Sequence, residues 1–274
     1  MQWDKVKNVL IVILVAVNLF LLGNLGARLW QNQQRETELV DSLRALAQGY
    51  GLTLDEGFSL PDDKVLPELS VDRSRPDEES VAAAILGDEV ERTEREDGTA
   101  VFESERGTVE WRADGRVQGS FTIEQESPAD EDAALRLARR LFADWRIQAD
   151  DAQTEVDGMT VTLSGAVAGL PVFNRTLSLR FDGENNVTLS GLWSFGTPYT
   201  TVSGSGISCN AADALLEFIS RQPEADSVLS MTVGYRMQLD SSRRLQLAPT
   251  WKITTDSSEY LVDCDKKTII DQEN

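Results

Sequence analysis

The side chains that could do chemistry in this chain are mostly carboxylates. Its 274 residues include 46 Asp and Glu and 26 Lys and Arg but no His, for a formal net charge of −20. The lack of His excludes Ser-His-Asp and Cys-His catalysis, His-ligated metal sites and a His pH switch. Paired carboxylates could hydrolyse a glycosidic bond, but no pair stands out from an acidic, solvated surface. We therefore expect a non-enzymatic protein without catalytic residues, cofactor or metal site.

The two cysteines, Cys209 and Cys264, are the remaining reactive groups. A disulfide between them would close a loop of about 55 residues and stabilise the fold by roughly 4 kcal/mol in the chain-entropy model. Two free buried thiols give the same sequence pattern. Both alternatives stay open.

The acidic charge also limits the partners. Residues 1–29 carry Lys5, Lys7 and Arg28 against Asp4, so the excess of acids lies entirely in the rest of the chain. Such a charge argues against binding to nucleic acid and against docking on anionic lipid headgroups. We expect no nucleic-acid partner.

An uncharged, apolar segment near the start predicts a membrane anchor. Residues 8–27 carry no charge, and twenty residues of helix cover about 30 Å, the thickness of the hydrocarbon core. Lys5 and Lys7 indicate a cytoplasmic N-terminus and an extracytoplasmic remainder. A cleaved signal peptide is the alternative, but the run is longer than a signal's apolar region and lacks an Ala-x-Ala site. Residues 1–29 are thus predicted to form the tail and single-pass anchor.

One face of this expected helix combines small residues with one amide. Ala16, Gly23 and Ala27 allow close approach of a second helix, and Asn18 near the bilayer centre can hydrogen-bond across the contact. We predict a transmembrane helix interface at these four positions. A single-pass anchor also tolerates one Asn and one Gly without a partner.

Beyond the anchor, the pattern alternates between helices and short strands. A helix is expected over residues 33–49, with Leu39, Leu43, Leu46 and Tyr50 at three- and four-residue spacing. It is either a stalk packed on the first domain or a juxtamembrane coil. Three prolines indicate a linker over residues 60–76. Further helices are expected at 77–86, 127–145 and 210–221, the last two with Ser127 and Ser208 as N-caps.

A group of strands follows each of the three later helices, with Asp-Gly pairs at the hairpin turns. The expected strands are 89–95, 100–105, 108–112 and 117–124; 154–156, 160–167, 172–181 and 187–195; 228–239, 245–255, 259–263 and 268–270. This order predicts an α+β fold of helices packed on antiparallel β-meanders. We expect one extracytoplasmic module over residues 30–126 and a second over 127–274, the latter as two units, 127–203 and 204–274.

Several segments resemble a known family. The opening MQWDKVK (residues 1–7) and NLFL (18–21) look like the start of YycI proteins. LAPTWKI (247–253) with YLVD (260–263) resembles the closing hairpin shared by YycI and YycH regulators, and LPVFN (170–174) resembles a strand of the family. Gln2, where Asp is common, and the strong acidity are departures from it.

The resemblance implies a non-catalytic regulator of the WalK/WalR (YycG/YycF) two-component system of Gram-positive bacteria, acting on cell wall metabolism. It implies that the membrane helix contacts a WalK-like sensor histidine kinase and that the extracytoplasmic domain pairs with a YycH-like protein. The alternatives are a membrane-anchored cell-envelope hydrolase and a glycan- or ligand-binding sensor domain. An apolar pocket would favour the sensor, and two carboxylates about 5–9 Å apart in a cleft would favour the hydrolase.

Overall fold

The structure is a computed structural model that describes residues 38–87, 89–147, 154–200, 206–221 and 224–270. The expected anchor, with Ala16, Asn18, Gly23 and Ala27, lies outside these residues. Within the described ranges, no helix is both long enough and apolar enough to cross a bilayer.

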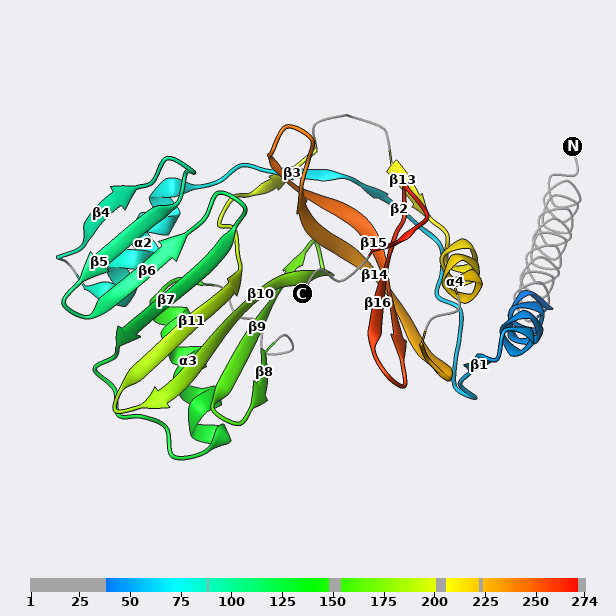
Figure 1. Cartoon of the computed structure of the whole chain (residues 1–274), viewed down its shortest axis with the longest axis horizontal. Coiled ribbons are helices and arrows are strands. Elements are labelled where there is room, and N and C mark those ends of the chain that lie inside the picture. The colour runs from blue at the N-terminus through cyan, green and yellow to red at the C-terminus, as the bar shows by residue number, and fades with distance from the viewer. Residues whose placement is uncertain (1–37, 88, 148–153, 201–205, 222–223, 271–274) are drawn as a thin grey trace, which may run out of the picture.

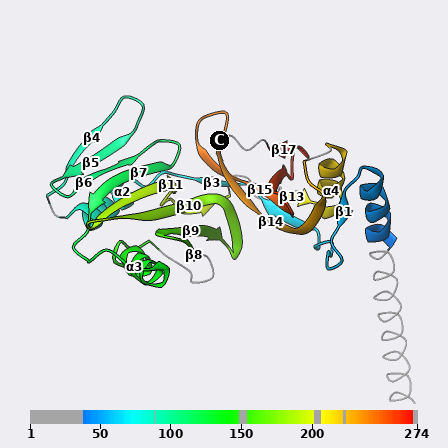
Figure 2. The same ribbon diagram turned by 60° about the horizontal axis from the view of Figure 1, so that its bottom comes forward.

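The α+β class is confirmed. A large 15-stranded sheet and a small two-stranded sheet form the framework. The large sheet is mixed rather than purely antiparallel, because β14 (Ser227–Leu239) pairs in parallel with β1 (Thr53–Leu54) and with β10 (Leu170–Gly183). Figures 1 and 2 show the strands and helices gathered into two lobes.

The first lobe is an antiparallel sheet with two helices on one face (Figures 1 and 2). Its strands run in the spatial order β4 (Glu91–Glu94), β5 (Ala100–Ser104), β6 (Gly107–Trp111), β7 (Arg116–Thr122), β11 (Asn186–Leu192), β10, β9 (Thr160–Val167) and β8 (Thr154–Asp157). The helices are α2 (Arg75–Leu86) and α3 (Glu131–Asp144).

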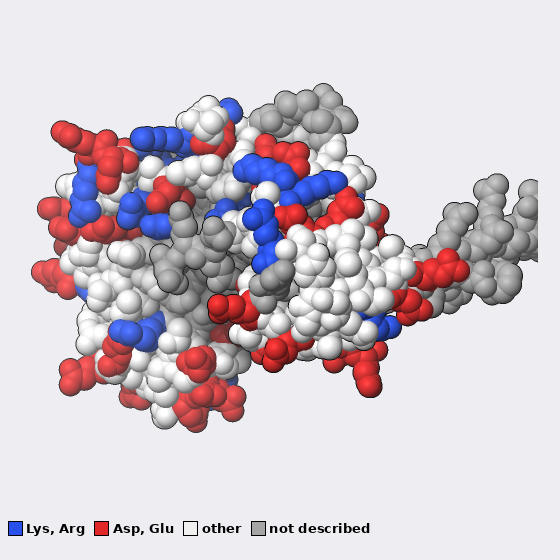
Figure 3. All heavy atoms as spheres, turned by 45° about the vertical axis from the view of Figure 1, so that its right-hand side comes forward, with Lys and Arg blue, Asp and Glu red and all other residues white. Residues whose placement is uncertain are grey.

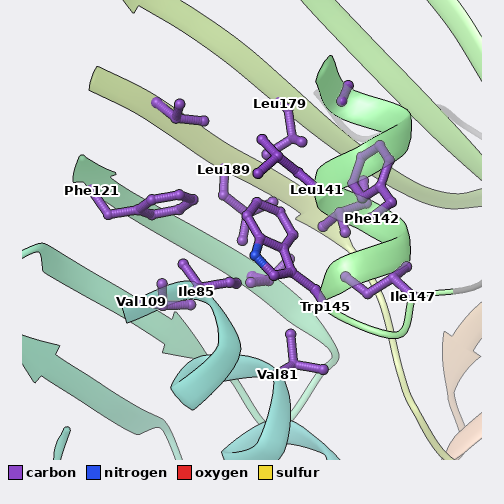
Figure 4. Packing of buried hydrophobic residues seen from close by; sticks show 14 of the residues in the cluster. Val81, Ile85, Val109, Phe121, Leu141, Phe142, Trp145, Ile147, Leu179 and Leu189 are labelled. Atoms are coloured by element: carbon purple, nitrogen blue, oxygen red, sulfur yellow. The ribbon is translucent and has the colours of Figure 1, made fainter. Parts of the chain in front are cut away.

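The core of the first lobe forms around Trp145, which directly follows α3 (Figure 4). Its indole meets Phe121 edge-on at 5.8 Å and Phe142 at 6.1 Å between ring centroids. Val81 and Ile85 of α2 belong to the same buried cluster. One apolar core therefore binds both helices to one sheet, as expected when amphipathic helices cover a sheet face.

The second lobe has a twisted sheet and two helical segments (Figure 1). Its strands are β1, β3 (Leu69–Val71), β12 (Pro198–Tyr199), β14, β15 (Leu245–Thr255), β16 (Glu259–Asp263) and β17 (Ile269–Ile270). Residues 38–49 are helical, and α4 spans Ala211–Ser220. The separate two-stranded sheet pairs β2 (Lys64–Pro67) with β13 (Gly206–Cys209). Leu43, Leu215, Phe218 and Trp251 lie in the shared core.

The sheet topology crosses the expected module boundaries. β7 pairs with β11 over seven residues, so the boundary expected between residues 126 and 127 falls inside one sheet. At the other end, β3 pairs with β15, which joins the segment before α2 to the C-terminal strands. Pairing between strands that are far apart in the chain produces no local sequence pattern, so the sequence could not predict these contacts.

The expected linker over residues 60–76 is wrong in part, since it contains β2 and β3 and the start of α2. Pro67 ends β2, and Pro76 lies in the first turn of α2, where a missing backbone N–H leaves no hydrogen bond unmade. These prolines therefore mark the ends of elements rather than a linker.

Both expected serine N-caps are also wrong. Asp130 caps α3 by accepting from the Ala133 N–H at 2.7 Å, and Asn210 caps α4 by accepting from the Asp213 N–H at 2.8 Å. Ser127 instead accepts from the Asn185 N–H at 2.8 Å, and Ser208 lies inside β13. Ser, Asp and Asn are similarly good N-caps, so residue type alone could not show which of them caps each helix.

Candidate functional site

The helix at residues 38–49 leaves much of its expected apolar face uncovered. Leu43 is 3% exposed and packs in the core, as does Ala47. Leu39, Leu46 and Tyr50, which share the same apolar spacing, are 42%, 41% and 48% exposed. The second lobe therefore covers only one edge of the apolar stripe.

A groove separates this helix from α4. Leu46 and Tyr50 line one side, while Leu216 of α4, itself 39% exposed, lines the other. The groove measures about 450 Å³. Its rim is polar, with Lys267 Nζ bound to Asp213 Oδ2 at 2.6 Å. The lining thus mixes apolar and charged side chains, a combination that also occurs at protein interaction sites.

A second groove of about 450 Å³ flanks the same helix near Leu39. Its far wall is the segment from Phe58 to Asp63 together with the start of α4. Asp63 fixes that wall by accepting from the Ala211 N–H at 2.9 Å and from Asn210 Nδ2 at 2.8 Å. A carboxylate at a helix N-terminus is favoured by the exposed N–H groups and the helix dipole.

We call the exposed side chains of Leu39, Leu46, Tyr50 and Leu216 the apolar ridge. Ion pairs lie close to it, such as Arg221–Glu217 at 2.9 Å on α4. Figure 3 shows charged side chains scattered over the face in view, with a broad uncharged area on the second lobe flanked by acidic residues. The ridge can bind an apolar surface, while the surrounding charges select the orientation of a partner.

The structure brings the two cysteines together in the core of the second lobe. Cys209 ends β13, Cys264 directly follows β16, and both thiols are free. The thiol of Cys264 donates a hydrogen bond to the sulfur of Cys209, which lowers the pKa of Cys209. Deprotonation of Cys264 would break this hydrogen bond, and this cost, together with burial, raises the pKa of Cys264.

A half-buried cation lies on β10, the strand shared by the lobes. The guanidinium carbon of Arg175 lies 4.4 Å from the ring centroid of Trp193, and Nη2 donates to the Ser194 carbonyl at 2.8 Å. Burial lowers the pKa of Arg175. Stacking on the indole stabilises the cation, which suits a structural role at this junction.

The remaining predicted positions give no further site. Ala16, Asn18, Gly23 and Ala27 lie outside the described residues. In the part of the chain that the structure describes, no group of three Cys, Asp or Glu side chains is placed to hold a metal ion. The sequence did not predict that Leu216 or residues 58–63 line a groove. The signal that could have indicated a groove is a helix with more large apolar residues than one buried face requires.

No protein-family model and no curated protein sequence matches the chain. Among solved structures, it is similar to an uncharacterized protein from Eubacterium rectale, with 10% identity, 81% of this chain and 91% of the other covered, and a TM-score of 0.45. It is also similar to the C-terminal domain of Bacillus megaterium YpeB, with 9% identity, 73% and 98% covered, and a TM-score of 0.34. At these scores neither similarity identifies the fold or the function.

Proposed function

We propose that the protein is a non-enzymatic, membrane-anchored regulator that binds another protein through the apolar ridge. The observation that carries the proposal is the exposure of Leu46, Tyr50 and Leu216 around one groove. Each of these side chains is less than half exposed, so burying the exposed part supplies roughly 0.6–1.5 kcal/mol each on association, before the entropic costs of binding.

The position of the ridge along the chain supports a partner at the membrane. We place the anchor at residues 1–29, with a cytoplasmic N-terminus and an extracytoplasmic remainder. Ten residues, 28–37, separate Ala27 from the described helix, and even fully extended they reach at most about 35 Å. The ridge is thereby held close to the outer face of the bilayer, within reach of another membrane protein's extracytoplasmic part.

The resemblance to YycI and YycH proteins narrows the proposal. We infer a WalK-like sensor histidine kinase as the partner of the membrane helix, with Ala16, Asn18, Gly23 and Ala27 at the contact. A YycH-like protein would bind the extracytoplasmic lobes. Regulation of a kinase linked to cell wall metabolism requires no catalytic group in this chain, only a contact whose free energy differs between two kinase states.

Binding by the ridge is tested with the full chain in membranes alongside the candidate kinase and the YycH-like protein. Leu46→Ser and Leu216→Ser are each expected to weaken co-purification roughly three- to eightfold, since burying the exposed two-fifths of one leucine contributes on the order of 0.6–1.2 kcal/mol. Leu229→Ser is the matched control, because Leu229 is 42% exposed but lies on β14, away from the groove lining. Unchanged co-purification of both ridge variants would contradict the proposal.

The membrane contact needs its own test. Photo-crosslinking residues placed one at a time from position 16 to 27 are expected to label the kinase with a helical period, strongest near Asn18 and Gly23. Labelling without periodicity would remove the proposed interface. A mature chain that starts near residue 30 would remove the anchor.

Groove volume favours a ligand-binding sensor as a second candidate. Each groove, at about 450 Å³, lies within the range of roughly 300–1,000 Å³ found for small-molecule sites. A rise in Tm with cell-wall fragments or acyl chains, abolished by Leu46→Trp, would support that function over protein binding.

A further inference from the structure

The two cysteines occupy a junction that backbone hydrogen bonds do not span. Among the described strands, β13 pairs only with β2, so neither belongs to the large sheet. Cys209 ends β13 and immediately precedes Asn210, the N-cap of α4. Cys264 follows β16, a strand of the large sheet. Side-chain packing is therefore what fixes the start of α4 against these C-terminal strands.

Both cysteine side chains lie in one apolar core. Cys209 is 0% exposed and Cys264 is 6% exposed, and both belong to the apolar cluster that includes Phe218 and Trp251. The backbone N–H of Cys264 donates to the Pro249 carbonyl at 3.1 Å, which fixes the start of its side chain. Cys264 lines the same pocket as Ile207 and Ser208, the two residues that precede Cys209, so the two cysteines lie close together in this cluster. A disulfide requires side chains that can face each other on nearby backbones.

Of the two thiols, that of Cys264 is the one that a small oxidant can approach. Cys264 forms part of the wall of a pocket of about 550 Å³, together with Ile207, Ser208 and Lys267. The ammonium of Lys267 is mostly exposed and lies at the same pocket.

We propose that Cys209 and Cys264 form an intramolecular disulfide that locks β13 and the start of α4 to the C-terminal strands. The oxidant is a low-molecular-weight disulfide such as oxidised glutathione. Its S–S bond breaks, an S–S bond forms between the two Sγ atoms, and two thiols of the reduced oxidant leave with the two protons. Two electrons pass from the protein to the oxidant.

This cross-link bears on the groove without depending on the proposed function. Asp213 and Leu216, which line the first groove, lie on α4, and Lys267 follows Cys264 by three residues. Locking the start of α4 onto the Cys264 segment fixes two walls of that groove relative to each other. In the reduced state, packing and the Lys267–Asp213 ion pair hold them.

The test uses the full chain in detergent, reduced and then incubated with excess oxidised glutathione. After denaturation and alkylation with iodoacetamide, mass spectrometry is expected to find two alkylated cysteines in the reduced sample. In the oxidised sample we expect none, with a loss of two hydrogen atoms from the chain mass. The oxidised monomer should melt about 8–16 °C higher than the reduced one.

Three results would overturn the proposal: both cysteines still alkylated after oxidation, stable glutathione adducts on both, or disulfides only between chains. Cys209→Ser and Cys264→Ser serve as controls, and neither should show the oxidant-dependent rise in Tm. An equal rise in either variant would also contradict the cross-link. Wild-type protein supplies the main comparison, so a poorly folding variant would leave the result intact.

Discussion

The side-chain amide of Asn174 on β10 pairs with the backbone of Met237 on β14. Asn174 Nδ2 donates to the Met237 carbonyl at 2.8 Å, and Asn174 Oδ1 accepts from the Met237 N–H at 2.8 Å. The backbone ladder between these strands is a single pair, Val172 with Tyr235. A side chain thus continues the hydrogen bonding of β14 where β10 turns away into the first lobe.

Replacing Asn174 by Ala is expected to destabilise the protein. Met237 is 3% exposed, so its N–H and carbonyl would lose their partners in a dry environment, at about 1–3 kcal/mol each. Urea unfolding followed by tryptophan fluorescence measures the change. Asn186→Ala, at an exposed position of β11, should shift the free energy of unfolding by less than about 0.5 kcal/mol. Equal midpoints for the two variants would contradict the role of Asn174.

Glu78 on α2 is expected to be far more important than its neighbour Glu79. Glu78 is buried and receives two hydrogen bonds from Arg73, at 2.6 and 2.8 Å. The same guanidinium donates to the carbonyls of Gly98 and Trp111. Glu78→Gln leaves the Arg73 cation without its counter-charge and should lower the free energy of unfolding by about 3–5 kcal/mol.

Glu79→Gln is the control for that substitution. Glu79 pairs with Arg92 at the surface, where removal of one charge changes stability by about 0–1 kcal/mol. Chemical denaturation of both variants at low and high salt checks the comparison, because only the exposed pair is strongly screened. A similar loss for the two variants would contradict the burial argument.

Gly196 is expected to tolerate no side chain. A Cβ at this position would overlap the carbonyl oxygen of Asp72, part of a backbone that a small shift cannot clear. Gly196→Ala should therefore lower Tm markedly. Gly49→Ala is the matched change, since no atom lies within 4 Å of its Cβ position and alanine favours the helix by about 0.5–1 kcal/mol. Differential scanning calorimetry that gave the same sign for both would contradict this reading.

The pH dependence of stability should carry a contribution from Asp256. Its carboxylate accepts from the backbone N–H groups of Ser227 at 2.9 Å and Asp226 at 3.1 Å, and these bonds lower the pKa of Asp256. Since the folded pKa lies below the unfolded value of about 4, the stabilisation is complete above that value and is lost as the pH falls through the folded pKa.

The urea midpoints of wild type and Asp256→Asn are expected to differ at pH 7 and to converge as the pH is lowered toward about 3. A gap for Asp256→Asn that stayed constant or widened in acid would contradict the assigned sign.

Local patterns predicted most of the longer elements because they depend on neighbours in the chain. The Asp-Gly pairs at hairpins are an example, since Gly98 and Gly115 adopt φ of 79° and 85°, a region that glycine enters without strain. Short strands such as β2 and β3 were missed because their partners, β13 and β15, lie far along the chain. Their prolines also outweighed the few apolar residues in the pattern.

The candidate site could be predicted only in part. Apolar spacing predicted the helix that carries Leu39, Leu46 and Tyr50, but it could not show which of these side chains are buried. Exposure depends on how far α4 and the Phe58–Asp63 wall extend over that helix, which is a matter of tertiary packing. The expected membrane contact lies outside the described residues and stays a prediction.

By itself, the sequence determined the acidic charge, the apolar N-terminal segment, the α+β class and the reach of most helices and strands. These follow from composition and from periods of two or 3.6 residues, which adjacent residues encode. Tertiary structure alone decided that Asn174 joins the lobes, that Cys209 meets Cys264 and that the apolar ridge stays open. Each depends on which distant segments come into contact, and burial is a property of that whole arrangement.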